Sequence, residues 1–148
     1  MISLDGLREA EEFLHKQIPL TRAMGVRLVA DGARFAVEAP VALNSNHLQT
    51  AFGGSINAVA TLAGYAFLWL EVHDVPAHVV IRDSTIRFLR PVRETLRATC
   101  VAPATDALAE FHRRLTNNGK AAIELHVEVK EHGLLAAEFV ATFVARRE

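Results

Sequence analysis

The feature that most constrains this chain is a run of twenty uncharged residues, Ala51 to Leu70. The run is long enough to cross a bilayer as a helix. Yet glycines and polar side chains interrupt it, and its flanks, His47 and Glu71, show no basic bias. We therefore expect no membrane span. A helix that is apolar on nearly all sides is otherwise one that protein encloses.

Composition sets the class of molecule. The chain has 148 residues, 51% hydrophobic and 22% charged, which predicts one domain over 1–148 with a sizeable core. A net charge of −1 gives no general attraction to nucleic acid. The single cysteine, Cys100, excludes an internal disulfide, and no histidine set has metal-ligand spacing, so we expect no metal. Acidic residues from Asp5 onward do not fit a signal peptide, which predicts a cytoplasmic location.

The order of elements predicts an α+β architecture. A short amphipathic helix precedes a hairpin that turns at Asp31-Gly32, and the long helix ends near His73. Residues 106–117 fit either a helix or an irregular strand extension. A helix about 30 Å long needs a curved antiparallel sheet around it to cover so many apolar sides. The strands expected to form that sheet are 26–30, 33–39, 79–89, 96–102, 121–130 and 134–147.

Three motifs carry a family resemblance. They are N-S-N-H-L-Q-T-A-F-G-G-S before the apolar helix, then D-S-T-I-R-F-L-R-P-V, and later N-G-K-A. In this order they resemble the putative thioesterase family of the hot-dog fold, in the form that stands without an acetyltransferase domain. The resemblance implies a homodimer, with a tetramer left open, whose active sites lie where one helix start meets the partner's long strand. It implies acyl-CoA or acyl-carrier-protein substrates, and no cofactor beyond the coenzyme A or phosphopantetheine of the substrate.

The start of the long helix suits thioester chemistry for a physical reason. The first turn of a helix leaves N–H groups unpaired and carries partial positive charge. Gly53 and Gly54 have no side chains there, so a thioester oxygen can approach these donors and be stabilised as it becomes an oxyanion or enolate. The alternative is that both glycines only allow close packing of the helix.

The resemblance assigns roles around this turn. Related hot-dog thioesterases have His-Gly-Gly at the helix start, and Phe52 stands at the histidine position. Six residues earlier lies Asn46, whose amide would orient the thioester or a water. Many relatives carry Asp or Glu nine residues after the histidine position, where this chain has Thr61. The alternatives are that Asn46 bonds its own loop and Thr61 a helix carbonyl. Expected substrate contacts nearby are Asn44, His47, Phe52 and Ser55.

Asp83 is the remaining candidate acid. It lies in the middle of the strand expected at 79–89, where a carboxylate needs a partner. Either Arg82 or Arg87 pairs with it, or it faces the cleft, including that of a second subunit. Glu71 lies at the far end of the helix, too distant to serve.

Basic side chains after this strand suggest where a carrier binds. We expect Arg90, Arg93 and Lys120 to hold coenzyme A phosphates or the acidic face of an acyl carrier protein. The alternative is an ordinary solvated strand end.

The missing acid leaves the reaction open. Hydrolysis needs an activated water, whereas decarboxylation of a malonyl thioester does not, and the family that the chain resembles includes malonyl-acyl-carrier-protein decarboxylases that feed the initiation of fatty-acid synthesis. Thioester hydrolysis is the broad expectation, with this decarboxylation and a non-catalytic acyl-thioester binding module as alternatives. A hot-dog hydratase is the least favoured, because it needs a histidine with an acid in the cleft.

Overall fold

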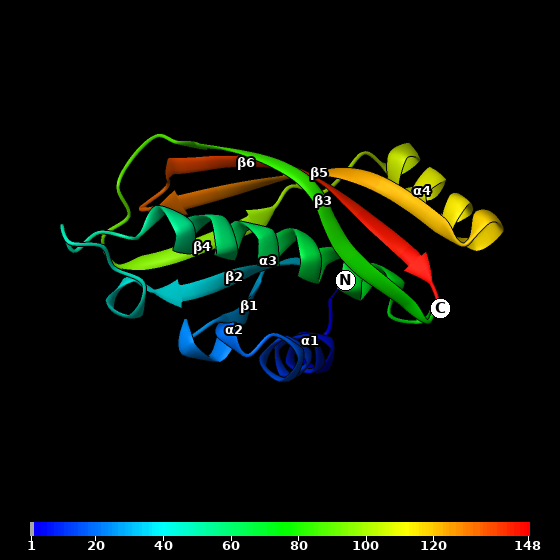
Figure 1. The fold of residues 1–148 in the computed structure, drawn as a ribbon, viewed down its shortest axis with the longest axis horizontal. Coiled ribbons are helices and arrows are strands. Elements are labelled where there is room, and N and C mark those ends of the chain that lie inside the picture. The colour runs from blue at the N-terminus through cyan, green and yellow to red at the C-terminus, as the bar shows by residue number, and fades with distance from the viewer. Residues whose placement is uncertain (1) are drawn as a thin grey trace.

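A computed structural model describes residues 2–148 as a curved six-stranded sheet wrapped around one long helix (Figure 1). The strand order is β1-β2-β4-β5-β6-β3, and every neighbouring pair is antiparallel. The strands are β1 (Arg27–Asp31), β2 (Arg34–Pro40), β3 (Ala77–Phe88), β4 (Thr95–Cys100), β5 (Lys120–Glu131) and β6 (Leu134–Arg147). The helices are α1 (Leu4–Gln17), α2 (Leu20–Ala23), α3 (Gly53–Val72) and α4 (Thr105–Asn118), with a 3-10 turn at Val41–Leu43. The predicted α+β architecture is confirmed.

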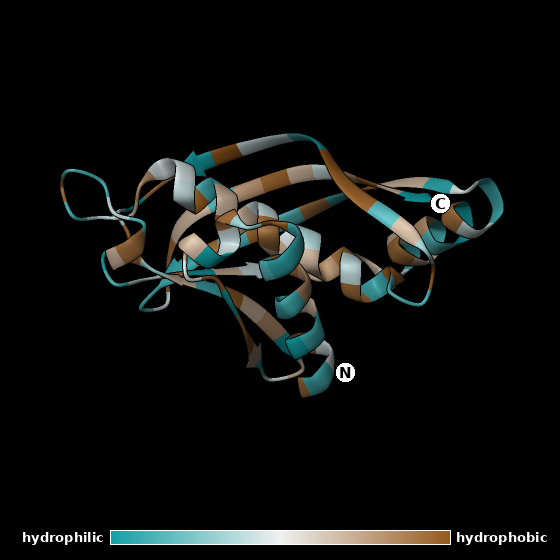
Figure 2. Ribbon diagram, turned by 60° about the horizontal axis from the view of Figure 1, so that its bottom comes forward, coloured by the Kyte–Doolittle hydropathy of each residue, from teal (hydrophilic) through white to brown (hydrophobic). Residues whose placement is uncertain are grey.

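Local sequence accounts for most of these elements. Along β5, buried and exposed residues alternate, as in a strand with one wet face. The hairpin to β6 turns at His132 and Gly133, both with positive φ, as a two-residue turn requires. Residues 106–117, which the sequence left undecided, lie in α4, and Gly119 ends that helix with a φ of 75°. In Figure 2 the outer turns are hydrophilic, while hydrophobic bands recur along the strands around α3.

Helix α3 is long and apolar enough to span a membrane, but the sheet wraps around it. Its mean hydropathy of 1.3 over 18 residues would suit a membrane span, but half of that window is buried inside the fold. The helix packs tightly on β6 at Gly64, where a Cβ atom would come within 2.6 Å of the Phe143 ring. The glycine therefore lets the sheet approach the helix axis closely.

Strand β3 forms one edge of the sheet and contains a bulge. Ile81 pairs with Phe143 and Asp83 with Thr142, so Arg82 is the extra residue. A bulge of one residue reverses which side chains face α3, because successive strand residues point to opposite faces. Phe143 faces α3, so Thr142 and its partner Asp83 lie on the opposite face.

We predict that Gly64→Ala destabilises the fold. Overpacking against the Phe143 ring should cost about 1–3 kcal/mol, and the better helix propensity of alanine recovers at most about 1 kcal/mol of it. The free energy of unfolding, measured by denaturant titration, should therefore fall. The matched control is Gly53→Ala, where a Cβ atom would meet Phe88 at an ordinary 3.5 Å. Equal stability of the two variants would contradict the close packing of α3 on β6.

Candidate active site

The loop before α3 is held by a buried asparagine. The Asn44 amide donates hydrogen bonds to the carbonyl oxygens of Met24 (2.9 Å) and Pro40 (2.8 Å). Its own carbonyl accepts from the Phe52 N–H at 2.7 Å, which fixes the residue before the helix. The side chain is buried. The structure thus gives Asn44 a structural position, and it does not line the hollow beside the start of α3.

The Asn46 carboxamide is turned into its own loop. Its Oδ1 accepts from the N–H groups of Leu48 (2.9 Å) and Thr50 (3.2 Å), and its Nδ2 donates to the Thr50 hydroxyl at 3.0 Å. This is the alternative that the sequence left open for Asn46. In this arrangement its amide shapes the loop, while His47 lies exposed at the tip.

The helix start keeps two free donors. The Phe52 carbonyl accepts from the N–H groups of Ser55 (2.9 Å) and Ile56 (3.0 Å). Within residues 2–148, by contrast, the N–H groups of Gly53 and Gly54 have no hydrogen-bond acceptor. They lie at the positive end of a twenty-residue helix dipole. An anionic oxygen therefore has two amide donors available to it.

An apolar hollow of about 360 Å³ lies beside these donors. Gly53 opens onto it, and the Phe88 ring of β3 forms the facing wall. The exposed Phe52 ring lies against Gly54, where it occupies the space that a side chain would take. The lining contains one charged residue and no carboxylate; it consists of Ala51, Gly53, Ile56, Phe88, Leu89, Arg90 and Pro91.

Thr61 does not replace the absent helix acid. Its hydroxyl donates to the Asn57 carbonyl at 2.9 Å, the routine bond of a helical threonine. A hydroxyl used in this way has no base beside it. Within the hollow's lining and along this helix turn, the chain therefore offers polar groups that orient but none that readily removes a proton.

The bulge in β3 removes Asp83 from the helix-facing side, which corrects the expectation that it faces the cleft of its own subunit. Its carboxylate is largely exposed and lies 3.4 Å from Arg82 Nε. Ser84 pairs with Ala141 and so lies on the face toward α3 instead. Hydrophobic alternation does not predict this exchange, because the position of a bulge does not follow from it.

A carboxylate clamps the loop that carries the candidate cations. Glu131 accepts from the backbone N–H groups of Arg93, Glu94 and Thr95 at 2.9 to 3.3 Å. Burial alone would raise the pKa of Glu131, but these hydrogen bonds outweigh burial and lower it. The loop is therefore held at neutral pH. Arg90 lies between the hollow at Gly53 and a second hollow of about 280 Å³ that Arg93 helps to line.

Lys120 lies too far away to act with these arginines in one subunit. It begins β5, whereas Glu131, which holds the Arg93 backbone, ends that strand. Eleven residues of strand span about 36 Å. Within a subunit the strand therefore separates Lys120 from Arg90 and Arg93, so the three cannot bind a single phosphate together, and their contact with coenzyme A or a carrier protein stays a prediction.

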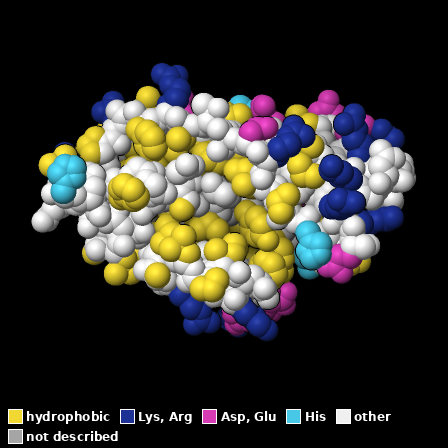
Figure 3. All heavy atoms as spheres, viewed as in Figure 1, with side chains coloured by type: hydrophobic (Ala, Val, Ile, Leu, Met, Phe, Trp, Pro, Cys, Tyr) yellow, Lys and Arg dark blue, Asp and Glu magenta, His cyan; other side chains and the backbone are white. Residues whose placement is uncertain are grey.

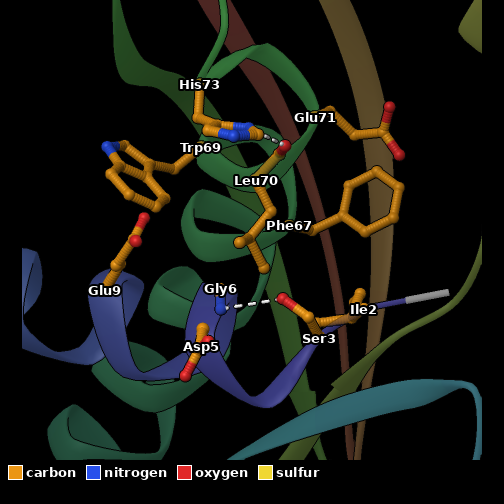
Figure 4. Close-up of a pocket in the computed structure, with 10 residues that line it drawn as sticks. All are labelled: Ile2, Ser3, Asp5, Gly6, Glu9, Phe67, Trp69, Leu70, Glu71 and His73. Carbon is orange, nitrogen blue, oxygen red and sulfur yellow. Dashed lines mark hydrogen bonds between the residues drawn. The ribbon is translucent and has the colours of Figure 1, made fainter.

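A larger hollow of about 430 Å³ lies at the other end of α3, against the start of α1 (Figure 4). Trp69 and Glu9 form one side, and Phe67 and Glu71 the other. Carboxylates and the negative end of the helix dipole disfavour a phosphate or an oxyanion there. Size alone therefore does not select this hollow as the site of thioester chemistry.

Comparisons with known proteins agree with this fold. The family model described as "Putative thioesterase (yiiD_Cterm)" matches residues 7–147. A solved structure of a putative thioesterase from Shewanella oneidensis is 28% identical, with a TM-score of 0.86 over 96% of this chain and 98% of that one. A protein of unknown function from Chlorobaculum tepidum TLS is 24% identical, with a TM-score of 0.88 over 95% and 94% of the two chains.

More distant structures share the fold alone. A probable thioesterase from Pseudomonas aeruginosa is 22% identical, with a TM-score of 0.80 over 95% of each chain. The Escherichia coli PaaI protein from the phenylacetic acid degradation operon is 16% identical, with a TM-score of 0.62 over 100% of this chain and 96% of that one. The family model covers nearly every residue, and the sheet wrapped around one helix is the hot-dog architecture of these neighbours. The chain belongs to the putative thioesterase family of hot-dog proteins.

Proposed function

We propose that this protein hydrolyses acyl-CoA or acyl-carrier-protein thioesters at the start of α3. The observation that carries the proposal is the pair of free N–H groups at Gly53 and Gly54 beside an apolar hollow. A thioester oxygen that accepts from both donors is stabilised as water adds to the carbonyl carbon and negative charge moves onto the oxygen. The attacking water gives up one proton to surrounding water, the carbon–sulfur bond breaks as the carbonyl re-forms, and the departing thiolate takes a proton from solvent.

The rest of the substrate fits the surroundings of this turn. Apolar side chains such as Ile56 and Phe88 provide a wall for the acyl group. Arg90 and Arg93 lie beyond Pro91, where the phosphates of coenzyme A or the acidic surface of a carrier protein would approach. A cytoplasmic location stays a prediction.

Decarboxylation of a malonyl thioester is the second candidate, because no carboxylate lines the hollow and the Thr61 hydroxyl is already bonded. In that reaction the bond to the carboxylate carbon breaks and carbon dioxide leaves. The electron pair forms an enolate whose oxygen the two N–H groups stabilise. A proton from solvent then gives the acetyl thioester, so no protein base is needed.

The active form is a homodimer that pairs through β3. This edge strand has unpaired backbone groups, and hydrophobic side chains on it are exposed, among them Val80 (58%), Ile81 (38%) and Phe88 (54%). Figure 3 shows hydrophobic side chains around a hollow on the face where α3 and β3 lie in Figure 1. An exposed edge of this kind is a template for another strand. Antiparallel self-pairing would bring the first half of the partner's β3 beside Phe88, next to the hollow.

Two substrate panels distinguish the reactions. The purified protein is incubated with acyl-CoA thioesters of increasing length and with malonyl-CoA, and with the same acyl groups on an acyl carrier protein. Release of free thiol supports hydrolysis. Release of carbon dioxide with the thioester retained supports decarboxylation. Binding of the panel without either product would leave the non-catalytic module and exclude the proposed enzyme.

We predict that Gly53→Pro lowers turnover by about 10²–10³-fold, the usual effect of losing one oxyanion donor. Proline removes the N–H but is tolerated at the first helical residue. Phe52, with φ −63° and ψ 133°, already has the backbone conformation that a following proline favours. Gly53→Ala is the control, since it adds a Cβ atom and keeps the donor. If both variants lose the same activity, the hollow's volume matters rather than the N–H group.

We predict that Val80→Lys yields a monomer with little activity, because a charge on the edge strand opposes pairing. Sedimentation velocity measures the oligomeric state, and the thioester panel measures activity. Leu20→Lys, on an exposed leucine in α2, is the control and should leave both unchanged. A Val80→Lys variant that sediments like the unmodified protein would count against pairing through β3.

A further inference from the structure

Asn57, in the second turn of α3, carries the one buried side-chain polar atom without a hydrogen-bond partner within residues 2–148. The atom is Oδ1. Buried polar groups in native proteins are nearly always paired, so an exception needs an explanation. Turning the amide over would exchange oxygen for nitrogen and still leave a buried polar atom without a partner. The backbone carbonyl of Asn57, by contrast, accepts the Thr61 hydroxyl.

The helix geometry places Asn57 beside the proposed reaction site. It lies four residues after Gly53, hence on the same face and about 6 Å further along α3. Gly53 faces Phe88, because a Cβ atom there would meet the ring at 3.5 Å. Strand β3 runs back along α3, and two of its residues span about 6.6 Å. These spacings put Asn57 near Ile86, and Ser84 lies two strand residues further along α3.

We propose that Asn57 is a positioning residue for the thioester reaction. Its unpaired amide oxygen accepts a hydrogen bond from a donor that arrives with the reaction. That donor is either the O–H of the attacking water or an N–H of the pantetheine arm. The inference rests on the proposed function, since it places the donor one helical turn from the Gly53 and Gly54 amides.

This role explains why the position is not hydrophobic. Its neighbours Ile56, Val59 and Ala60 belong to the core, and the helix is apolar on most sides. Asn57 itself is partly buried with its Oδ1 turned inward, and a leucine there would spare the cost of an unpaired acceptor. Retaining a polar group that the free protein leaves unpaired is typical of residues kept for function at the expense of stability.

The test compares Asn57→Leu with the unmodified protein in two independent measurements. Because the substitution removes an unpaired buried group, the melting temperature should rise, by about 2–4 °C. The value of kcat/KM for the best thioester in the panel should fall by about tenfold. Asn117→Leu, on the exposed face of α4, makes the same chemical change far from the site and serves as the control for helix propensity.

The kinetic constants identify the donor. A fall in kcat at unchanged KM assigns it to the attacking water, and a rise in KM assigns it to the pantetheine arm. Asn57→Asp keeps an acceptor only when ionised, and burial raises the pKa of a carboxyl. Its activity should therefore be low at acid pH and recover as pH rises, a profile that a purely structural residue would not produce.

Two results would overturn the inference. A melting temperature of Asn57→Leu at or below that of Asn117→Leu would mean that the amide is satisfied in the free protein. A higher melting temperature with unchanged kcat and KM would mean that the amide takes no part in the reaction. The stability measurement needs no substrate, so it stands even if the panel shows no thioester chemistry and the proposed function fails.

Discussion

The contact between α3 and β6 is the constraint on which the rest of the structure depends. Because Gly64 lacks a side chain, the Phe143 ring packs directly on the helix, and the sheet curves closely around it. A helix covered in this way has a fixed axis, so its first turn has a fixed position as well. The free amides at Gly53 and Gly54 are therefore preorganised, which is what makes a backbone donor effective in stabilising developing charge.

In the loop before α3, polar side chains hold the chain in place, while backbone N–H groups at the helix start stay free. Asn44 and Asn46 use their amides to hold the chain that enters the helix. The two groups left free are the N–H donors of the glycines, and these belong to the backbone rather than to side chains. The polarity of the loop is thus explained largely by the need to pair backbone groups around a sharp entry into an apolar helix. The element that we propose to be reactive is the helix start that this loop exposes.

Predictions from the sequence are correct where hydrophobic periodicity and turn residues are strong signals. They are wrong where a bulge or the path of a strand determines which residues lie together. The enclosed helix and the alternating strand at 121–130 follow from hydrophobic pattern, and both are present. Asp83 was misplaced because one bulged residue reverses the faces of a strand, and alternation carries no mark of it. Lys120 was grouped with Arg90 and Arg93 because sequence shows basic residues but not the strand that separates them. Asn57 belongs to no sequence motif, and only the structure shows that its amide oxygen is buried without a hydrogen-bond partner.

Strand β3 joins assembly and chemistry in one element. Its Phe88 ring faces Gly53 across the hollow, while its outer edge has no neighbour in the sheet. In a single subunit, the strand that bounds the hollow is therefore hydrogen-bonded to a neighbour on one edge only. Such an edge strand unfolds locally more readily than a central strand. Pairing of two such edges would steady the wall and exclude water from the hollow, which strengthens the hydrogen bonds of the two amides to a thioester oxygen. The exposed hydrophobic residues on β3 thus fit a site that depends on a second subunit. The hydrogen bond that each amide donates becomes stronger as solvent is excluded around it.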